Sequence, residues 1–162
     1  EYKRIDLLLR LWERVRPVTG GQLVIVGDGP ERERLERLAG PGVRFTGPVS
    51  GEEKRRLLAS SGVYVAPNLG GESFGIVVIE AMAAGCAVVA SDLPAFVDVT
   101  GGQAAVHVPV GDPAALGTAI ADLLKNESRA VSLGEAGRDR AERYDWPVVV
   151  EQYRQLYEEA RS

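Results

Sequence analysis

The stretch "GVYVAPNLGGESFGIVVIEAMAAGCAVVAS", residues 62–91, carries the pattern that predicts the fold. Residues 62–68 and 87–91 are short runs rich in alanine and β-branched valine, as in buried strands. The middle of residues 70–85 reads as a buried helix that is apolar all the way round except at Glu80. A strand, a helix and a second strand in this order predict parallel strands joined by a crossover helix.

The same alternation of short strands and helices runs along the rest of the chain. Further apolar strands are expected at residues 22–27, 43–47 and 104–111. Helices are expected at residues 5–15, 30–40, 50–61, 94–99, 113–125, 128–143 and 146–160, the first of them ending at Pro17. The pattern predicts an α/β protein with an open parallel sheet that is covered by helices on both faces.

Composition and charge exclude several classes of protein. The 162 residues suffice for one domain with a core, and 45% hydrophobic with 26% charged residues is typical of soluble globular proteins. A net charge of −4 argues against a nucleic-acid partner. Cys86 is the single cysteine, which excludes an internal disulfide and favours a reducing, cytoplasmic setting. Because the chain starts at Glu1 without a methionine and enters a helix almost at once, we expect a fragment.

The predicted topology points to four loops as places for a ligand. In open parallel sheets, ligands bind beyond the carboxyl ends of the strands, where the following helices begin. The loops in question are residues 27–30, 47–51, 67–74 and 91–96.

The loop at residues 67–74 has the features of a phosphate or diphosphate site. Gly70 and Gly71 allow the backbone to turn sharply and to approach a ligand closely. Four backbone amides are expected to be unpaired first-turn donors, with the positive end of the helix dipole behind them. These amides belong to Ser73, Phe74, Gly75 and Ile76.

Two carboxylates flank this expected phosphate site. Helical side chains lean toward the N-terminus, so the carboxylate of Glu80 should point back toward the loop, where a ribose joined to the diphosphate would lie. Glu72 should lie on the other side of the phosphates, beside a transferred group. The alternatives are structural: Glu72 can simply favour a helix N-terminus, and Glu80 can be half-exposed or paired with an arginine.

Other candidate residues have ordinary structural explanations. The glycines of "VGDGP", Gly27 and Gly29, form a turn without the full dinucleotide-binding spacing. Lys3 and Lys54 read as solvated charges, and His107 as a packed core residue in an apolar strand. The sequence contains no Ser/His/Asp set, no metal-ligand spacing and no P-loop.

Together these motifs resemble a known family. "GGESFGIVVIEAMAAGCAVVASD" resembles the signature of retaining GT-B glycosyltransferases of the family 4 type, with Glu72 and Glu80 as its E-x7-E motif. The resemblance continues through "LVIVGDGP", "VRFTGPVS" and "RYDWPVVVEQY" and covers nearly the whole chain. Within the family, the bacterial phosphatidylinositol α-mannosyltransferases, which use GDP-mannose, are most similar. The resemblance implies the Rossmann-like C-terminal half of a GT-B fold, which binds a nucleoside diphosphate sugar.

The resemblance also implies roles for individual residues. Glu72 would contact the hydroxyls of the transferred sugar, Glu80 would bind the ribose, and Lys3 would neutralise the diphosphate. Val49 would present its backbone to the base, with Lys54 nearby. The other implied contacts are the loop backbone at Gly71, Ser73, Phe74, Gly75 and Ile76, and the cleft wall at Gly27 and Gly29. Donor binding in the family needs no metal or other cofactor.

Two parts of the family pattern are missing from residues 1–162. The N-terminal domain with the acceptor site is absent, and so is the first strand of the donor domain. We therefore expect residues 1–162 to form one donor-binding domain that transfers little sugar alone. Its acceptor would be a molecule such as the membrane lipid phosphatidylinositol, with the whole enzyme cytoplasmic and peripheral at the membrane.

Three rival interpretations remain open from the sequence. A glycosyltransferase of this type could use a UDP- or ADP-sugar with another acceptor. A non-catalytic nucleotide-binding module could keep the fold alone. A sugar-nucleotide epimerase has the same architecture, although such enzymes do not usually carry the Glu-Ser-Phe-Gly run.

Overall fold

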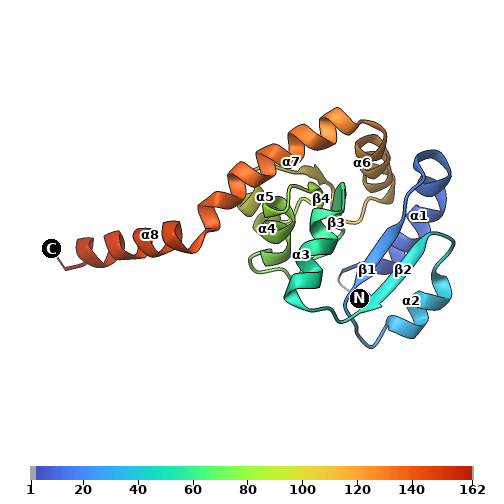
Figure 1. Ribbon diagram of the computed structural model, residues 1–162, viewed down its shortest axis with the longest axis horizontal. Coiled ribbons are helices and arrows are strands. Elements are labelled where there is room, and N and C mark those ends of the chain that lie inside the picture. Colours follow the sequence, from blue (N-terminus) through green and yellow to red (C-terminus); the bar gives the residue numbers. More distant parts are fainter. Residues whose placement is uncertain (1–2, 162) are drawn as a thin grey trace.

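The computed structural model describes residues 3–161, in which strands and helices alternate as predicted (Figure 1). The strands are β1 (Leu23–Val26), β2 (Val43–Gly47), β3 (Val63–Ala66), β4 (Ala87–Ser91) and β5 (Val106–Val108). The helices are α1 (Ile5–Thr19), α2 (Arg32–Leu38), α3 (Gly51–Ala59), α4 (Ile76–Ala83), α5 (Pro94–Thr100), α6 (Pro113–Lys125), α7 (Glu127–Ala141), the 3-10 turn η1 (Glu142–Tyr144) and α8 (Trp146–Glu159).

All strand pairs in β1–β5 are parallel, but they form two sheets rather than the single sheet predicted. β1 pairs with β2, with Leu23 opposite Val43, and β3, β4 and β5 pair in that order. Within residues 3–161, no strand pairing joins β1 to β3. The alternation of elements indicated parallel strands correctly. It could not show that β1 and β3 would not pair with each other.

The core lies on both faces of β4, whose five residues are all buried. Ala87 and Val89 pack into one hydrophobic cluster with residues of α1 and α6, whereas Val88 and Ala90 pack into the other with residues of α4 and α5. This alternation follows from the two-residue period of a strand. The prediction that helices cover both faces is therefore confirmed for the three-stranded sheet (Figure 1).

Several predicted element ends are wrong by a few residues. α1 continues through Pro17 to Thr19 and ends at Gly20, whose φ is 71°. Proline has no backbone N–H to bond the carbonyl four residues back, so α1 has one backbone hydrogen bond fewer at Pro17 but still continues for two more residues. The last strand covers three of the eight residues expected, because the backbone on either side of Val106–Val108 does not pair with β4.

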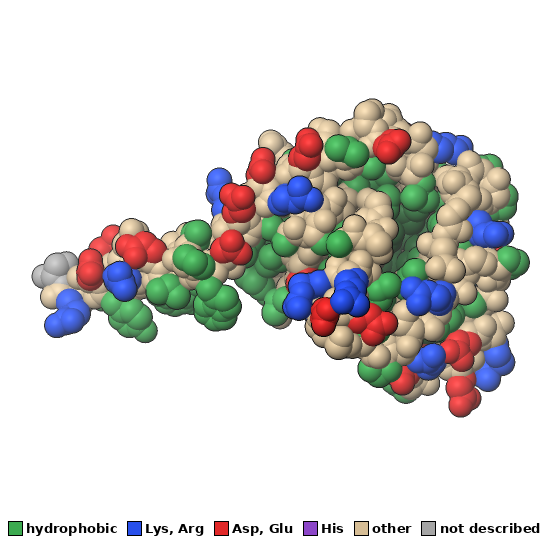
Figure 2. Space-filling model, in the orientation of Figure 1, with side chains coloured by type: hydrophobic (Ala, Val, Ile, Leu, Met, Phe, Trp, Pro, Cys, Tyr) green, Lys and Arg blue, Asp and Glu red, His purple; other side chains and the backbone are tan. Residues whose placement is uncertain are grey.

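Helix α8 projects away from the rest of the molecule, and none of its residues is buried (Figure 1). Large apolar side chains gather along one side of it in Figure 2, with Trp146 80% exposed. The apolar face of α8 is therefore open to solvent. No helix within residues 3–161 is both long and apolar enough to span a bilayer.

Candidate functional site

The four loops singled out in the sequence all follow the carboxyl ends of strands. β1, β2, β3 and β4 end at Val26, Gly47, Ala66 and Ser91, and α2, α3, α4 and α5 follow them in turn. Parallel strands bring such loops to the same edge of a sheet, where ligands bind in open α/β folds.

The loop between β3 and α4, residues 67–75 (the β3–α4 loop), ends in a turn that requires glycine. Gly75 is the N-cap of α4 with a φ of 85°, and a Cβ added there would lie 3.1 Å from the ring of Phe96. L-residues rarely adopt this left-handed backbone. The helix consequently begins at Ile76, so that Ser73 and Phe74 lie in the loop and not in the first turn predicted for them.

Glu72 folds back onto this turn. Its Oε1 accepts a hydrogen bond from the backbone N–H of Gly75 at 3.1 Å. One of the four amides expected to face a ligand is therefore occupied by the loop's own carboxylate. This contact fixes the Glu72 side chain at the beginning of α4, beside the positive end of the helix dipole.

Glu80 is held from the neighbouring helix α3. Its Oε1 lies 2.5 Å from the Nζ of Lys54, and the two side chains are about one-third exposed. The partner is thus a lysine, where the sequence suggested an arginine. The second oxygen, Oε2, is buried and has no hydrogen-bond partner within residues 3–161. A buried carboxylate oxygen without a donor is costly, and this atom has none within residues 3–161.

The sequence suggested that the helix carrying Glu80 is buried all the way round, but one side of α4 is exposed. Val78, Ala81 and Met82 are buried, but Ile76 is 62% exposed and Val77 also faces solvent. The apolar first turn of α4 therefore lies open beside the β3–α4 loop. Apolar composition alone could not distinguish this exposed side from the core side.

Tyr64 on β3 lies close to the two glutamates and was not singled out in the sequence analysis. Its side chain packs against the same cluster as α4. Burial, followed by the negative charges of Glu80 and Glu72, raises the pKa of its hydroxyl well above the ordinary value. The tyrosine thus lies within electrostatic reach of both glutamates. The available signal was a hydroxyl two residues before the end of an otherwise apolar strand.

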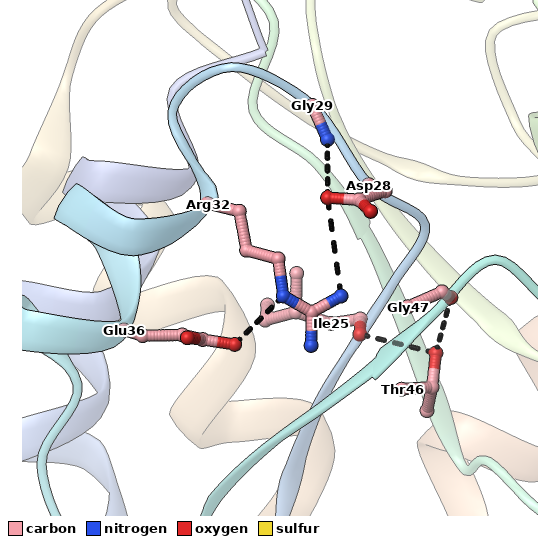
Figure 3. A network of polar contacts seen from close by, with 7 residues as sticks. All are labelled: Ile25, Asp28, Gly29, Arg32, Glu36, Thr46 and Gly47. Carbon is pink, nitrogen blue, oxygen red and sulfur yellow. Dashed lines mark hydrogen bonds and ion pairs between the residues drawn. The ribbon is translucent and has the colours of Figure 1, made fainter.

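The loops after β1 and β2 form one polar network (Figure 3). The N–H of Gly27 donates to the carbonyl of Gly47 at 2.9 Å, and Gly29 donates to Asp28 Oδ1 at 2.8 Å. Arg32 bonds Glu36 at 2.8 Å, and its guanidinium lies against Gly47. A Cβ at Gly27 or Gly29 would meet no atom within 4 Å, so both glycines border open space.

The remaining predicted residues occupy separate places. Val49 lies between β2 and α3, where Ser50 caps the helix by accepting the N–H of Glu53 at 3.1 Å. Lys3 is exposed and directly precedes Arg4, the non-glycine residue with a left-handed φ of 48° before α1. No group of three His, Cys, Asp or Glu residues suited to a metal is found in the part of the chain that the structure describes.

Cys86 and His107 both make contacts within the fold, as the sequence indicated for His107. Cys86 is buried and donates from Sγ to the carbonyl of Leu58 at 3.1 Å, and burial raises its pKa to about 11. His107 Nε2 lies 2.8 Å from Thr100 Oγ1. Burial lowers the pKa of His107 below its ordinary value, so its neutral form is favoured in the fold.

His107 should make stability depend on pH near neutrality. The pKa of His107 is lowered in the folded state. Below about pH 6.5 the unfolded chain therefore binds a proton at His107 more readily than the folded chain does. The free energy of unfolding should fall as the pH is lowered through this value, a change that urea titrations would measure. Since His107 is the sole histidine, His107→Gln should flatten the dependence. Equal slopes for the two proteins would contradict this account.

Gly75→Ala should destabilise the fold by about 1–3 kcal/mol, because it forces a side chain into a left-handed backbone against Phe96. Gly62→Ala is the matched control, since Gly62 has neither a positive φ nor an atom within 4 Å of the added Cβ. Urea unfolding should show a clear loss for the first variant and about 0.5 kcal/mol or less for the second. Similar losses for both would contradict the assigned geometry.

Comparison with known proteins identifies the family. Residues 1–126 match the family described as Glycosyl transferases group 1. The chain belongs to this family. The predicted resemblance to a glycosyltransferase family is thereby confirmed.

Relatives of this glycosyl transferase group 1 chain share its sequence closely. The phosphatidyl-myo-inositol mannosyltransferase of Mycobacterium leprae is 46% identical over 140 residues, covering 85% of this chain and 37% of the relative. The phosphatidyl-myo-inositol mannosyltransferase of Mycobacterium tuberculosis H37Rv is 43% identical over 162 residues. This match covers 95% of this chain and 42% of the relative. The chain thus spans about two fifths of the length of these relatives.

A solved structure confirms the predicted fold. Sucrose-phosphate synthase from Thermosynechococcus elongatus superposes on this glycosyl transferase group 1 chain with a TM-score of 0.85 at 32% identity. The match covers 99% of this chain and 43% of the synthase. The Rossmann-like α/β architecture of a GT-B glycosyltransferase domain is therefore shown.

Proposed function

We propose that this chain is the donor-binding half of a retaining glycosyltransferase that transfers mannose from GDP-mannose. The observation that carries the proposal is the pair of carboxylates around the start of α4, beyond the carboxyl end of β3. Glu72 is bonded to the turn at Gly75, and Glu80 is held by Lys54 with one buried oxygen left unpartnered. One carboxylate would face the sugar and the other the ribose.

The backbone around the carboxylates would bind the diphosphate. In this proposal the loop at Gly71, Ser73 and Phe74 approaches the phosphates and sugar, and the N-terminus of α4 at Ile76 adds the helix dipole. Lys3 would neutralise the diphosphate and stabilise the negative charge on it as it leaves. The base would lie against the backbone of Val49, with Gly27 and Gly29 forming the open wall of the cleft.

The proposed reaction exchanges one bond at the anomeric carbon for another. The bond between this carbon and the diphosphate oxygen breaks through an oxocarbenium-like transition state. The acceptor hydroxyl attacks from the face that the diphosphate leaves, and its proton passes to a departing phosphate oxygen. Glu72 would orient the sugar and stabilise positive charge that develops on it. The anomeric configuration is thereby retained.

The missing partner of this half would be an acceptor domain of the same polypeptide. β1 and β3 each have an edge that pairs with no strand within residues 3–161. Figure 2 shows hydrophobic side chains recessed between the β1–β2 pair and the three-stranded sheet. We propose that a further strand preceding α1 lies there, because a right-handed crossover through α1 would place it beside β1. The acceptor domain would precede that strand.

The proposed acceptor is phosphatidylinositol or a similar membrane lipid. The names of the mycobacterial relatives state a phosphatidyl-myo-inositol mannosyltransferase, and this supports both mannose and the lipid. The whole enzyme would then act at the cytoplasmic surface of a membrane.

Calorimetric titration of the whole enzyme with GDP, UDP and ADP tests the donor site. The proposal predicts saturable binding of GDP, tighter than that of the other two. A folded sample that binds none of them at millimolar concentration would refute the donor site. Tighter binding of UDP or ADP would instead refute GDP-mannose as the donor.

A further inference from the structure

An aromatic contact joins the β3–α4 loop to a distant part of the chain. The rings of Phe74 and Tyr144 lie with centroids 5.9 Å apart and planes at 86°, an edge-to-face pair. Such geometry is favoured between aromatic rings. Phe74 is 49% exposed, so this contact supports a side chain that otherwise meets much solvent.

Tyr144 is itself fixed to the end of α5. Its hydroxyl donates to the carbonyl of Val99 at 3.2 Å, and the guanidinium of Arg140 lies 5.7 Å from its ring centroid. Arg140 also donates to the carbonyls of Val99 at 2.9 Å and Asp98 at 2.7 Å. These carbonyls belong to the last turn of α5, where backbone acceptors need donors. The ring of Tyr144 that contacts Phe74 is therefore itself held in place by Val99 and Arg140.

The position of Phe74 sets the backbone on both sides of it. Phe74 precedes Gly75, whose amide holds the carboxylate of Glu72. Gly70 and Gly71 make the first half of the same loop conformationally permissive. A ring fixed by Tyr144 reduces the number of conformations open to the loop before a donor arrives. Donor binding then loses less free energy to the ordering of the loop.

We propose that Tyr144 is a positioning residue for the donor site, acting through Phe74 on the loop that carries Glu72. This inference rests on the proposed function, because it assigns Tyr144 a part in the use of the donor. Tyr144 also ends η1, and Asp145 follows as the N-cap of α8. The loop that would hold the sugar is thus linked to the segment from which α8 projects.

Steady-state kinetics of the whole enzyme with Tyr144→Leu, Phe74→Leu and the double variant test the inference. Each single variant should raise the KM for the sugar nucleotide by about 2–10-fold, the value of one aromatic pair. The KM for the acceptor should not change. The double variant should be no worse than either single one, since both remove the same contact. Tyr144→Phe keeps the ring but loses the hydrogen bond to Val99, so its donor KM should lie between those of the wild type and Tyr144→Leu.

A purely structural role would lower the fraction of active enzyme and leave both KM values unchanged. An unchanged donor KM in Tyr144→Leu, or additive effects in the double variant, would overturn the inference. If Tyr144→Leu does not fold, the Phe74→Leu variant tests the inference instead, because the ring of Phe74 is half-exposed and its replacement should leave the fold intact. An unchanged donor KM in Phe74→Leu would contradict the inference equally. Failure of the proposed function is distinguishable, since the wild type would then transfer no sugar at all.

Discussion

Glu72→Gln should reduce sugar transfer by the whole enzyme on the order of 10²–10³-fold while leaving the affinity for GDP nearly unchanged. Glutamine can still accept the N–H of Gly75 through its side-chain carbonyl, so the turn before α4 should keep its shape. The substitution removes the negative charge that we place beside the transferred sugar. The loss should therefore appear in kcat, as expected for an interaction that strengthens in the transition state.

Glu72→Ala is the companion variant, because it removes both the charge and the hydrogen bond to Gly75. It should transfer sugar no better than Glu72→Gln and should in addition lose some stability. Calorimetry with GDP and initial rates with GDP-mannose separate the two effects. Weakened GDP binding with a normal kcat would show that Glu72 contacts the nucleotide, contrary to the proposed role.

Glu80→Ala should weaken binding of GDP by about 10–100-fold, the value of hydrogen bonds between a carboxylate and hydroxyl groups. Oε2 of Glu80 is buried without a partner, whereas Oε1 is held by Lys54, so the carboxylate is oriented before a ligand arrives. The ion pair itself is partly exposed and should contribute about 0–1 kcal/mol to stability. The variant should consequently fold.

A matched ligand makes the test of Glu80 specific to the ribose. 2′,3′-Dideoxy-GDP lacks both hydroxyls and should bind the wild type about as weakly as GDP binds Glu80→Ala. For the variant, the two ligands should bind equally well, because the carboxylate that distinguishes them is gone. A variant that still prefers GDP by the wild-type factor would contradict the assignment of Glu80 to the ribose.

Much of the fold could be predicted because short apolar runs alternate with amphipathic segments. The run Ala87–Ser91 is apolar enough to be buried on both faces, and it became the central strand β4. The alternation also located the four loops at the carboxyl ends of the strands. The absence of pairing between β1 and β3 within residues 3–161 was not predictable, because a local sequence pattern does not show which strands lie side by side.

The sequence indicated which residues make up the candidate site, but not how their side chains and backbone are arranged. Gly-Gly-Glu-Ser before an apolar run indicated a turn that approaches a ligand, but the helix begins only at Ile76, with Gly75 as its N-cap. Lys54 was assigned to the donor, yet its ion pair with Glu80 connects two helices whose packing depends on the tertiary structure. Tyr144 was overlooked for the same reason, since it contacts Phe74 of the β3–α4 loop from η1.

The proposed chemistry is tested most directly by the product of a transfer reaction. The whole enzyme would be incubated with GDP-mannose and phosphatidylinositol, and the linkage of the product determined by NMR. The account predicts an α-linked mannosyl lipid, with the anomeric configuration of the donor retained and one GDP released per mannose transferred. A β-linked product, or release of GDP without transfer to any lipid acceptor, would contradict it.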